Sequence, residues 1–286
     1  MTALRAAITA AAATLSEAGI DCARTDAELL AAYAAGTERS RLLMLDSPDA
    51  DFYNRFGDAV AVRARRVPLQ HITGTAAFGP VQVAVGPGVF IPRPETESLL
   101  EWVLAQQLPR EPVIVDLCTG SGALALALAA ALPSACVIAV DDDDTALDYA
   151  RRNVEGSGIR LVRGDVTDAR LLPELAGSVD LVVANPPYIP TGAVLEPEVA
   201  QHDPAHALFG GPDGMAVIAP IVRHAAQWLR AGGLLAVEHD DTTSERTVAL
   251  IRATGAFGEV VARCDLAGRE RFVTARAIPG AERGEP

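Results

Sequence analysis

A short polar segment, Asn185-Pro186-Pro187-Tyr188, directly follows the apolar run 181–184. Each proline fixes its backbone φ angle and contributes no N–H donor, so the turn is stiff and rich in acceptors. The residue before a proline is also held extended. The side-chain oxygen of Asn185 and the carbonyl oxygen of Pro186 can therefore face one point and accept both hydrogens of a planar –NH₂ group, on which Tyr188 can stack. The segment predicts a site for an sp² amino nitrogen, such as that of adenine, cytosine or a glutamine amide.

The same segment predicts a reaction. An amide nitrogen is a poor nucleophile because its lone pair is delocalised. Acceptors that hold both of its hydrogens stabilise the positive charge that develops when the nitrogen attacks a sulfonium methyl group. The remaining contribution to catalysis is in-line placement of the nitrogen, the methyl carbon and the sulfur. No general base is evident nearby, and none is required if the proton leaves after transfer. The catalytic candidates are Asn185, Pro186 and Tyr188.

A glycine-containing loop, Asp116–Gly122, follows an expected strand and opens an expected helix. Gly120 and Gly122 lack a Cβ atom, so the backbone there can turn tightly and approach a ligand. Asp141 ends the next expected strand, where it is placed to accept hydrogen bonds from ribose hydroxyls. Ligands on parallel sheets bind at the carboxyl ends of the strands. The loop and the acid together predict a site for a nucleoside-type cofactor.

Two cofactors are compatible with this loop. Gly120, Gly122 and Ala125 also satisfy the dinucleotide fingerprint, which keeps NAD open. The alternative is S-adenosylmethionine, with its amino-acid end against the loop and its ribose at Asp141. A hydride-transfer enzyme has no use for a cage around an amino group, so the segment at Asn185 favours S-adenosylmethionine over NAD.

Further acids follow the second and third expected strands. Asp142, Asp143 and Asp144 are expected to form a solvated turn and a helix N-cap rather than to bind a ligand. Asp165 ends the third strand, and it either reaches the edge of a bound base or belongs to a surface turn.

Composition narrows the class of protein. The 286 residues carry 24 Lys+Arg and 37 Asp+Glu, a net charge of −13, which disfavours stable nucleic-acid binding because phosphates need a basic surface. The four cysteines and five histidines show no metal-ligand spacing, so neither a metal site nor a disulfide framework is expected. The longest apolar stretch, Ala123–Leu132, is shorter than the roughly 18 residues of a membrane span. We expect a soluble, cytoplasmic protein that does not bind membranes.

A small helical domain is expected at residues 1–68. Leu4, Ile8 and Leu15 recur at helical spacing. Thr25 and Glu28 form the T-x-x-E pattern of a capping box. Another helix is expected at 51–66, and the bundle should end near Pro68.

A β-hairpin connector is expected at residues 69–92. Valines at positions 81, 83 and 85 alternate with other residues, which predicts a hairpin between His71 and Phe90. The proline-rich Ile91–Pro94 can be neither helical nor mid-sheet, so it predicts a rigid link.

Helices alternate with short apolar strands in the remaining residues, 93–286. Strands are expected at 113–117, 136–140, 159–162, 179–184 and 234–238, with two last strands near 260 and at 272–275. Helices are expected at 96–107, 122–132, 146–155 and 216–229. Strands separated by helices predict an α/β fold with a mostly parallel, doubly wound, Rossmann-like sheet.

The glycine loop, Asp141 and Asn185–Tyr188 resemble the class I S-adenosylmethionine-dependent amino methyltransferases. Flanking segments narrow this resemblance. Phe90–Glu97, with the sequence F-I-P-R-P-E-T-E, is similar to the entry segment of the peptide chain release factor glutamine methyltransferases, the HemK/PrmC family. Further similar segments are Glu196–Val199, Gly210–Gly214 and Asp265–Arg271. The matches run in the family's order from about Arg66 to Arg276.

The resemblance implies N5-methylation of the glutamine amide in the Gly-Gly-Gln motif of class I peptide chain release factors, with S-adenosylmethionine as cofactor. The helical domain would then recognise the protein substrate, Phe90 would pack near the methionine end of the cofactor, and Asn185, Pro186, Pro187 and Tyr188 would bind the glutamine. The implied cofactor-binding residues are Phe90, Cys118, Thr119, Gly120, Ser121, Gly122, Asp141, Asp165, Val166 and Asn185.

Two positions depart from the family pattern, and two other functions stay open. Cys118 stands where the glycine loop often begins with Gly, and Val166 where some relatives have an aromatic residue over the adenine. The alternatives are an N6-adenine or N4-cytosine nucleic-acid methyltransferase and a nucleotide-binding module without catalysis. The acidic charge and the flanking segments disfavour the nucleic-acid enzyme.

Overall fold

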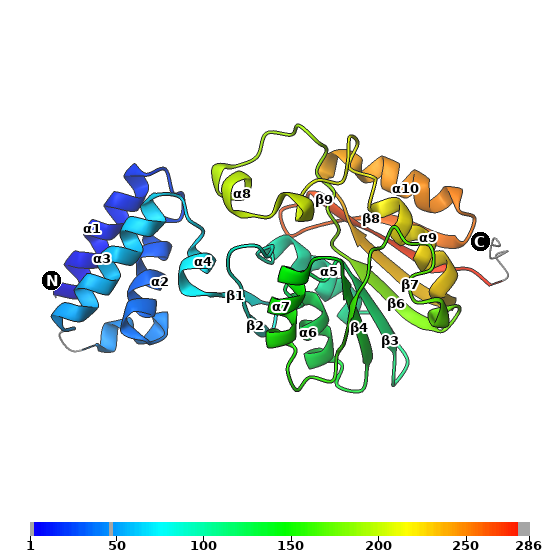
Figure 1. Cartoon of the computed structure of the whole chain (residues 1–286), viewed down its shortest axis with the longest axis horizontal. Helices are drawn as coiled ribbons and strands as arrows, with labels where there is room; N and C mark the ends of the chain where they lie inside the picture. Colours follow the sequence, from blue (N-terminus) through cyan, green and yellow to red (C-terminus); the bar gives the residue numbers. More distant parts are fainter. Residues whose placement is uncertain (1–2, 46–47, 280–286) are drawn as a thin grey trace. The chain divides into compact units, whose positions relative to one another are not determined.

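The computed structural model describes residues 3–45 and 48–279. The chain divides into two compact units, coloured along the sequence in Figure 1. The first runs to Thr75 and also includes Leu195–His202, whereas the second comprises Ala76–Val194 and the chain from Asp203 onward. Among the described residues, no helix has both the length and the apolar character needed to cross a bilayer.

The first unit is helical. Its elements are α1 (Ala3–Glu17), α2 (Ala23–Ala35), the 3-10 helix η1 (Arg39–Met44), α3 (Ala50–Ala64), α4 (Leu69–Thr73) and α8 (Pro197–His202). Leu15 and Leu30 are fully buried in its core, and Phe56 stacks on Phe52 with ring centroids 5.8 Å apart.

A buried arginine ties three helices of this unit together. Arg63 in α3 donates from Nε to Asp26 in α2 at 2.7 Å and from a terminal nitrogen to Glu198 in α8 at 3.0 Å. Arg66 also pairs with Glu198, at 3.1 Å. The Arg63 and Asp26 side chains are both less than a tenth exposed. Removing one partner of such a buried pair typically costs about 3–5 kcal/mol.

Two local predictions for this part of the chain are wrong. Thr25 does not cap a helix, because α2 begins at Ala23 with Cys22 as its N-cap. Glu28 instead pairs with Arg24 and Arg39, at 2.6 and 2.7 Å. The hairpin is also shorter than expected. Residues 69–73 form α4, and only β1 (Thr75–Phe78) and β2 (Val81–Ala84) pair.

The second unit contains a seven-stranded sheet with the order β5-β4-β3-β6-β7-β9-β8. Its strands are β3 (Val113–Leu117), β4 (Cys136–Asp141), β5 (Arg160–Arg163), β6 (Val179–Ala184), β7 (Leu229–Glu238), β8 (Phe257–Cys264) and β9 (Glu270–Ala277). Its helices are α5 (Pro94–Leu104), α6 (Ala123–Ala131), α7 (Asp144–Asn153), α9 (Ile218–Trp228) and α10 (Ser244–Ala253), with short 3-10 turns η2 (Pro173–Leu175), η3 (Ala205–Ala207) and η4 (Asp241–Thr243).

The predicted α/β class is confirmed. The pairs from β5 to β7 are parallel, and β9 runs antiparallel to both β7 and β8. Three details differ from expectation. β7 begins at Leu229 rather than Leu234, and α10 is absent from the predicted helices. The link was expected to exclude helix, but α5 begins at Pro94, because a proline fits the first position of a helix, where no N–H donor is needed.

Side chains from the central strands bury both faces of this sheet. Along β6, Val182 and Ala184 belong to one apolar cluster, which includes Trp228 of α9. Leu181 and Val183 belong to the other, which includes residues of α5 and α6. Figure 1 shows these two groups of helices on opposite sides of the sheet. Because successive strand residues point to opposite faces, a continuous apolar run is what a strand covered on both sides requires.

Candidate functional site

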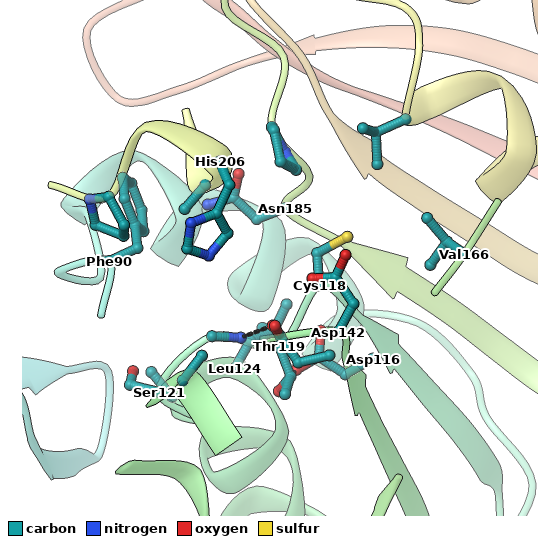
Figure 2. Close-up of a pocket in the computed structure, with 18 of the residues that line it drawn as sticks. Phe90, Asp116, Cys118, Thr119, Ser121, Leu124, Asp142, Val166, Asn185 and His206 are labelled. Carbon is teal, nitrogen blue, oxygen red and sulfur yellow. Dashed lines mark hydrogen bonds between the residues drawn. The ribbon is translucent and has the colours of Figure 1, made fainter. Parts of the chain in front are cut away.

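A cavity of about 270 Å³ opens at the edge of the sheet where β3, β4 and β6 end. Figure 2 shows part of its lining, with Phe90, His206 and Asn185 grouped together and Ser121 and Leu124 at another part of the wall. The structure brings most of the predicted site residues to this cavity. These are Phe90, Cys118, Thr119, Gly120, Ser121, Asp141, Asp165, Val166, Asn185 and Pro187. Among the described residues, Gly122, Pro186 and Tyr188 do not line it.

The glycine loop is held by a buried carboxyl group. Asp116, the fourth residue of β3, is 1% exposed and accepts a hydrogen bond from the Thr119 hydroxyl at 2.5 Å. The Thr119 N–H donates to the carbonyl of Val140 in β4 at 3.0 Å. Burial raises the pKa of Asp116 to about 7. These bonds fix the loop against the ends of two adjacent strands.

Asp141 joins the end of β4 to the same loop. Its Oδ2 accepts the Gly120 N–H at 2.8 Å, and its Oδ1 accepts the Asp143 N–H at 3.0 Å. Burial raises the pKa of Asp141, and these two backbone donors partly offset that effect. Because a carboxylate oxygen has two lone-pair sites, each one can still accept a ligand hydroxyl.

Two residues shape the backbone of the loop. Cys118 has a φ of +59°, a left-handed conformation that costs a non-glycine residue on the order of 1 kcal/mol. Burial raises the pKa of the Cys118 thiol, which keeps it protonated and a weak nucleophile at neutral pH. Gly122 has a φ of +80°, and a Cβ there would lie 3.3 Å from the side chain of Val154. Gly122 therefore serves close packing, while its neighbours line the cavity.

The acids after β4 and β5 have different roles. Asp143 accepts the Ala146 N–H at 2.8 Å and caps α7, which confirms the predicted N-cap in this run. Asp142 is exposed, as a solvated turn requires, and it also lines the cavity. Exposed Asp165 and buried Val166 also line the cavity.

Phe90 lines the cavity, and its ring contacts an arginine that forms an ion pair. The Arg93 guanidinium lies 5.0 Å from the centre of the Phe90 ring, and it pairs with the buried carboxylate of Asp203. This pair connects the proline-rich link to the segment that brings Pro204 and His206 to the cavity. His206 also lies 3.6 Å from Asp143.

The segment after β6 is held by residues distant in the sequence. Asn185 donates from Nδ2 to Thr96 at 3.0 Å, and the Tyr188 hydroxyl donates to Glu238 at 2.9 Å. Burial and the adjacent Glu238 carboxylate raise the pKa of Tyr188, so its hydroxyl remains a donor. The next residue, Ile189, exchanges backbone hydrogen bonds with Leu208 and Gly210, each of 2.9 Å.

Sequence reasoning assigned no role to three residues at or behind this site. Thr96 and His206 line the cavity, and Glu238 accepts hydrogen bonds behind it. Thr96 lies in the motif F-I-P-R-P-E-T-E, and Glu238 ends a strand of the parallel sheet. The motif and the strand end are sequence features that could have pointed to these two residues. His206 lies in a segment whose course could not be predicted.

The cavity has the chemistry that S-adenosylmethionine needs. Phe90, Leu124 and Val166 supply apolar surface, while the carboxylates of Asp141 and Asp142 suit ribose hydroxyls and a cationic sulfonium or ammonium group. Within the described ranges, no cluster of three or more His, Cys, Asp and Glu side chains is arranged to hold a metal ion.

Two family models match the chain. Residues 6–74 match the PrmC N-terminal domain, and residues 87–263 match the methyltransferase small domain. The sequence is 65% identical to a release factor glutamine methyltransferase of Mycolicibacterium smegmatis, over 97% of this chain and 99% of that protein. The proteins of the same name from Mycobacterium tuberculosis strain H37Rv and Streptomyces coelicolor are 63% and 46% identical, over 95% and 98% of this chain and 91% and 100% of theirs.

Proposed function

The chain belongs to the release factor glutamine methyltransferase family, and we propose that it methylates N5 of the glutamine side chain in the Gly-Gly-Gln motif of class I peptide chain release factors, with S-adenosylmethionine as methyl donor. The observation that carries this proposal is the position of Asn185. Its side chain lies at the wall of the cavity, within the segment Asn-Pro-Pro-Tyr that follows β6.

The cofactor would occupy the cavity between the glycine loop and Phe90. Asp141 would accept the ribose hydroxyls, and Thr119–Ser121 would bound the methionine end together with Phe90. Asp165 would reach the base edge, with Val166 packed against the base, and Cys118 and Gly122 would set the course of the loop. The bound cofactor supplies an electrophilic methyl group on a sulfonium sulfur.

The protein's part in the reaction is to hold and orient the nucleophile. The side-chain oxygen of Asn185 and the carbonyl oxygen of Pro186 would accept the two hydrogens of the glutamine amide. This draws electron density onto the nitrogen and stabilises its positive charge as the N–C bond forms and the C–S bond breaks. Pro187 lines the cavity and would confine the amide. Tyr188 does not line the cavity, and it would hold the segment in place through its hydrogen bond to Glu238. One proton then leaves the nitrogen for solvent.

We further propose a division of labour along the chain. Residues 1–68 would recognise the protein substrate, 69–92 would connect, and 93–286 would bind the cofactor and carry out methyl transfer. A substrate that works in translation would place the protein in the cytoplasm. The net charge of −13 does not favour a stable complex with nucleic acid.

Peptide mass spectrometry tests the proposed reaction. The full-length protein is incubated with a class I release factor and S-adenosylmethionine carrying a deuterated methyl group. We expect one labelled methyl group on the glutamine of the Gly-Gly-Gln peptide. Label in adenine or cytosine of added DNA or RNA, with the glutamine unmodified, would replace this proposal with the nucleic-acid enzyme. Cofactor binding without transfer to any of these substrates would indicate a binding module.

A further inference from the structure

A chain of three hydrogen bonds lies behind Asn185. Asn185 Nδ2 donates to Thr96 Oγ1 at 3.0 Å, and the Thr96 hydroxyl donates to Glu238 Oε2 at 2.7 Å. The other oxygen of Glu238, Oε1, accepts from the Tyr188 hydroxyl at 2.9 Å. The four side chains come from the first turn of α5, the loop after β6 and the last residue of β7.

The chemistry of these groups gives the chain a direction. When Glu238 is ionised it only accepts hydrogen bonds, so both hydroxyls turn their hydrogens toward it. A hydroxyl has one hydrogen. Once the Thr96 hydroxyl has donated its hydrogen to Glu238, only its lone pairs face Asn185. These lone pairs accept a hydrogen bond from the –NH₂ group of the Asn185 carboxamide. The carboxamide oxygen of Asn185 is thereby turned away from Thr96.

This direction matters because the two ends of an asparagine side chain have nearly the same shape. The hydrogen-bond partners decide which end faces where. If Thr96 could donate to Asn185, the flipped carboxamide would fit equally well. It would then present –NH₂ to a substrate –NH₂ group, and two donors would face each other.

Burial makes the wrong orientation of these hydrogen bonds more costly. Glu238 is 1% exposed and Thr96 is 4% exposed, so water does not compete for these bonds. In such surroundings an unmade hydrogen bond costs the full desolvation of the group, about 1–3 kcal/mol. Thr96 also lines the cavity, so the chain ends at the proposed reaction site rather than within the core.

We propose that Glu238 and Thr96 are positioning residues that orient the carboxamide of Asn185, so that its oxygen faces the nitrogen to be methylated. This rests on the proposed function, in which Asn185 accepts a hydrogen of the substrate amide. Neither residue touches the substrate nitrogen in this scheme. Their effect passes entirely through Asn185.

Two near-isosteric substitutions test the direction of the chain. Glu238→Gln keeps the shape of the side chain but adds a donor, which can turn the Thr96 hydroxyl toward Asn185. Thr96→Val keeps the shape but removes the hydroxyl. Each should lower kcat for release factor methylation by about 10²-fold, the scale of a misoriented catalytic group. The KM for the release factor and the affinity for S-adenosylmethionine should stay near the wild-type values.

Thr96→Ser is the matched control, because it retains the hydroxyl and should keep kcat near that of wild type. The double variant Thr96→Val/Glu238→Gln should lose about as much kcat as either single variant, since both changes break the same chain. Calorimetry with S-adenosylmethionine and thermal unfolding establish that each variant is folded.

Several results would overturn the proposal. They are wild-type kcat in both single variants, losses in the double variant that multiply, or a Thr96→Ser variant as slow as Thr96→Val. A loss of folding or cofactor binding that accounts for the whole effect would leave these residues a purely structural role and equally reject the proposal. Failure of the proposed function has a different signature, because the wild-type protein itself would then leave the glutamine unmethylated.

Discussion

Gly214 lies so close to Tyr188 that a Cβ atom on the glycine would stand 2.3 Å from the tyrosine's carbonyl oxygen. The φ of Gly214, +78°, is also one that side chains rarely adopt. Gly210 approaches the same loop, where its Cβ would lie 2.5 Å from the carbonyl oxygen of Pro187. The G-G-P-D-G motif therefore supports the segment after β6 by direct backbone packing, which only glycine allows.

Gly214→Ala should displace that segment and slow methyl transfer by about 10²-fold, because a shift of 1 Å at a reacting group has an effect of that size. Binding of S-adenosylmethionine should change little, since the glycine loop is held by other contacts. The matched control is Gly192→Ala, which has a φ of +93° but would meet no atom within 4 Å. Rate assays and calorimetry on both variants check this. Equal activity of the two variants would mean that the close approach to Tyr188 does not matter.

Much of the site could be predicted from the sequence because its residues stand at the ends of strands. Asp116, Asp141 and Asn185 each stand at or next to the carboxyl end of a buried strand. Parallel strands gather such ends at one edge, so apolar runs alone predicted that these residues meet. The stiff Pro-Pro turn and the glycine loop then limited what the edge could bind.

Side-chain partners far along the chain could not be predicted in the same way. Thr96 and Glu238 are 142 positions apart, and their contact depends on how α5 packs against the end of β7. No periodic pattern encodes that packing. The error at Thr25 has a related cause, because Glu28 found its partners in Arg24 and in Arg39, beyond the end of α2. Tertiary contacts there replaced a local capping pattern.

Asp141→Ala should weaken S-adenosylmethionine binding by roughly 1–3 kcal/mol, because it removes the proposed acceptor for the ribose hydroxyls and leaves the Gly120 N–H without its partner. Asp144→Ala is the matched control. It removes the same charge from the same acidic run, but its side chain is mostly exposed and pairs with Arg163. Titration calorimetry compares the two variants with wild type. An unchanged affinity for Asp141→Ala would exclude Asp141 from the cofactor site.

The rate of methyl transfer should depend on the protonation of Glu238. Burial raises the pKa of this carboxyl to about 7, and the charge of Glu95 adds to the rise. The hydrogen bonds from Thr96 and Tyr188 and the charge of Arg271 oppose it. Below that pH the protonated group gains a hydrogen that it can donate to Thr96, so the direction of the chain is lost. We expect kcat at pH 6 to be about tenfold below its plateau, because roughly a tenth of Glu238 is then ionised.

The expected loss of rate at low pH cannot come from unfolding caused by protonation of Glu238. A carboxyl whose pKa is higher in the folded protein makes folding take up a proton between the unfolded value of 4.5 and about 7. Its contribution to stability therefore falls as the pH rises through that window, opposite to the rate. The control is Glu238→Gln, whose slower kcat should show no step near pH 7. A step of the same size in that variant would assign the titration to another group.

Asn185→Ala should lower the rate of methyl transfer by on the order of 10²–10³, the typical effect of losing one preorganised partner of a developing charge. The variant loses one of the two proposed acceptors for the glutamine amide. It also loses the hydrogen bond to Thr96 at 3.0 Å, which anchors the loop. The protein should remain folded and bind S-adenosylmethionine, somewhat more weakly, because Asn185 also lines the cavity.

Asn185→Asp distinguishes the role of the side-chain oxygen from that of the –NH₂ group, because it keeps an acceptor but removes the donor to Thr96. A carboxylate still accepts a hydrogen from the substrate, so some activity should survive. However, its other oxygen would face a Thr96 oxygen whose hydrogen is already given to Glu238, and activity should stay below that of wild type. Asn54→Ala, on the exposed face of α3, is the control and should match wild type. Single-turnover methylation of a release factor, read by peptide mass spectrometry, ranks the four proteins. Full activity of Asn185→Ala would remove this side chain from the reaction, since no hydrogen-bond acceptor for the glutamine amide would then be needed at this position.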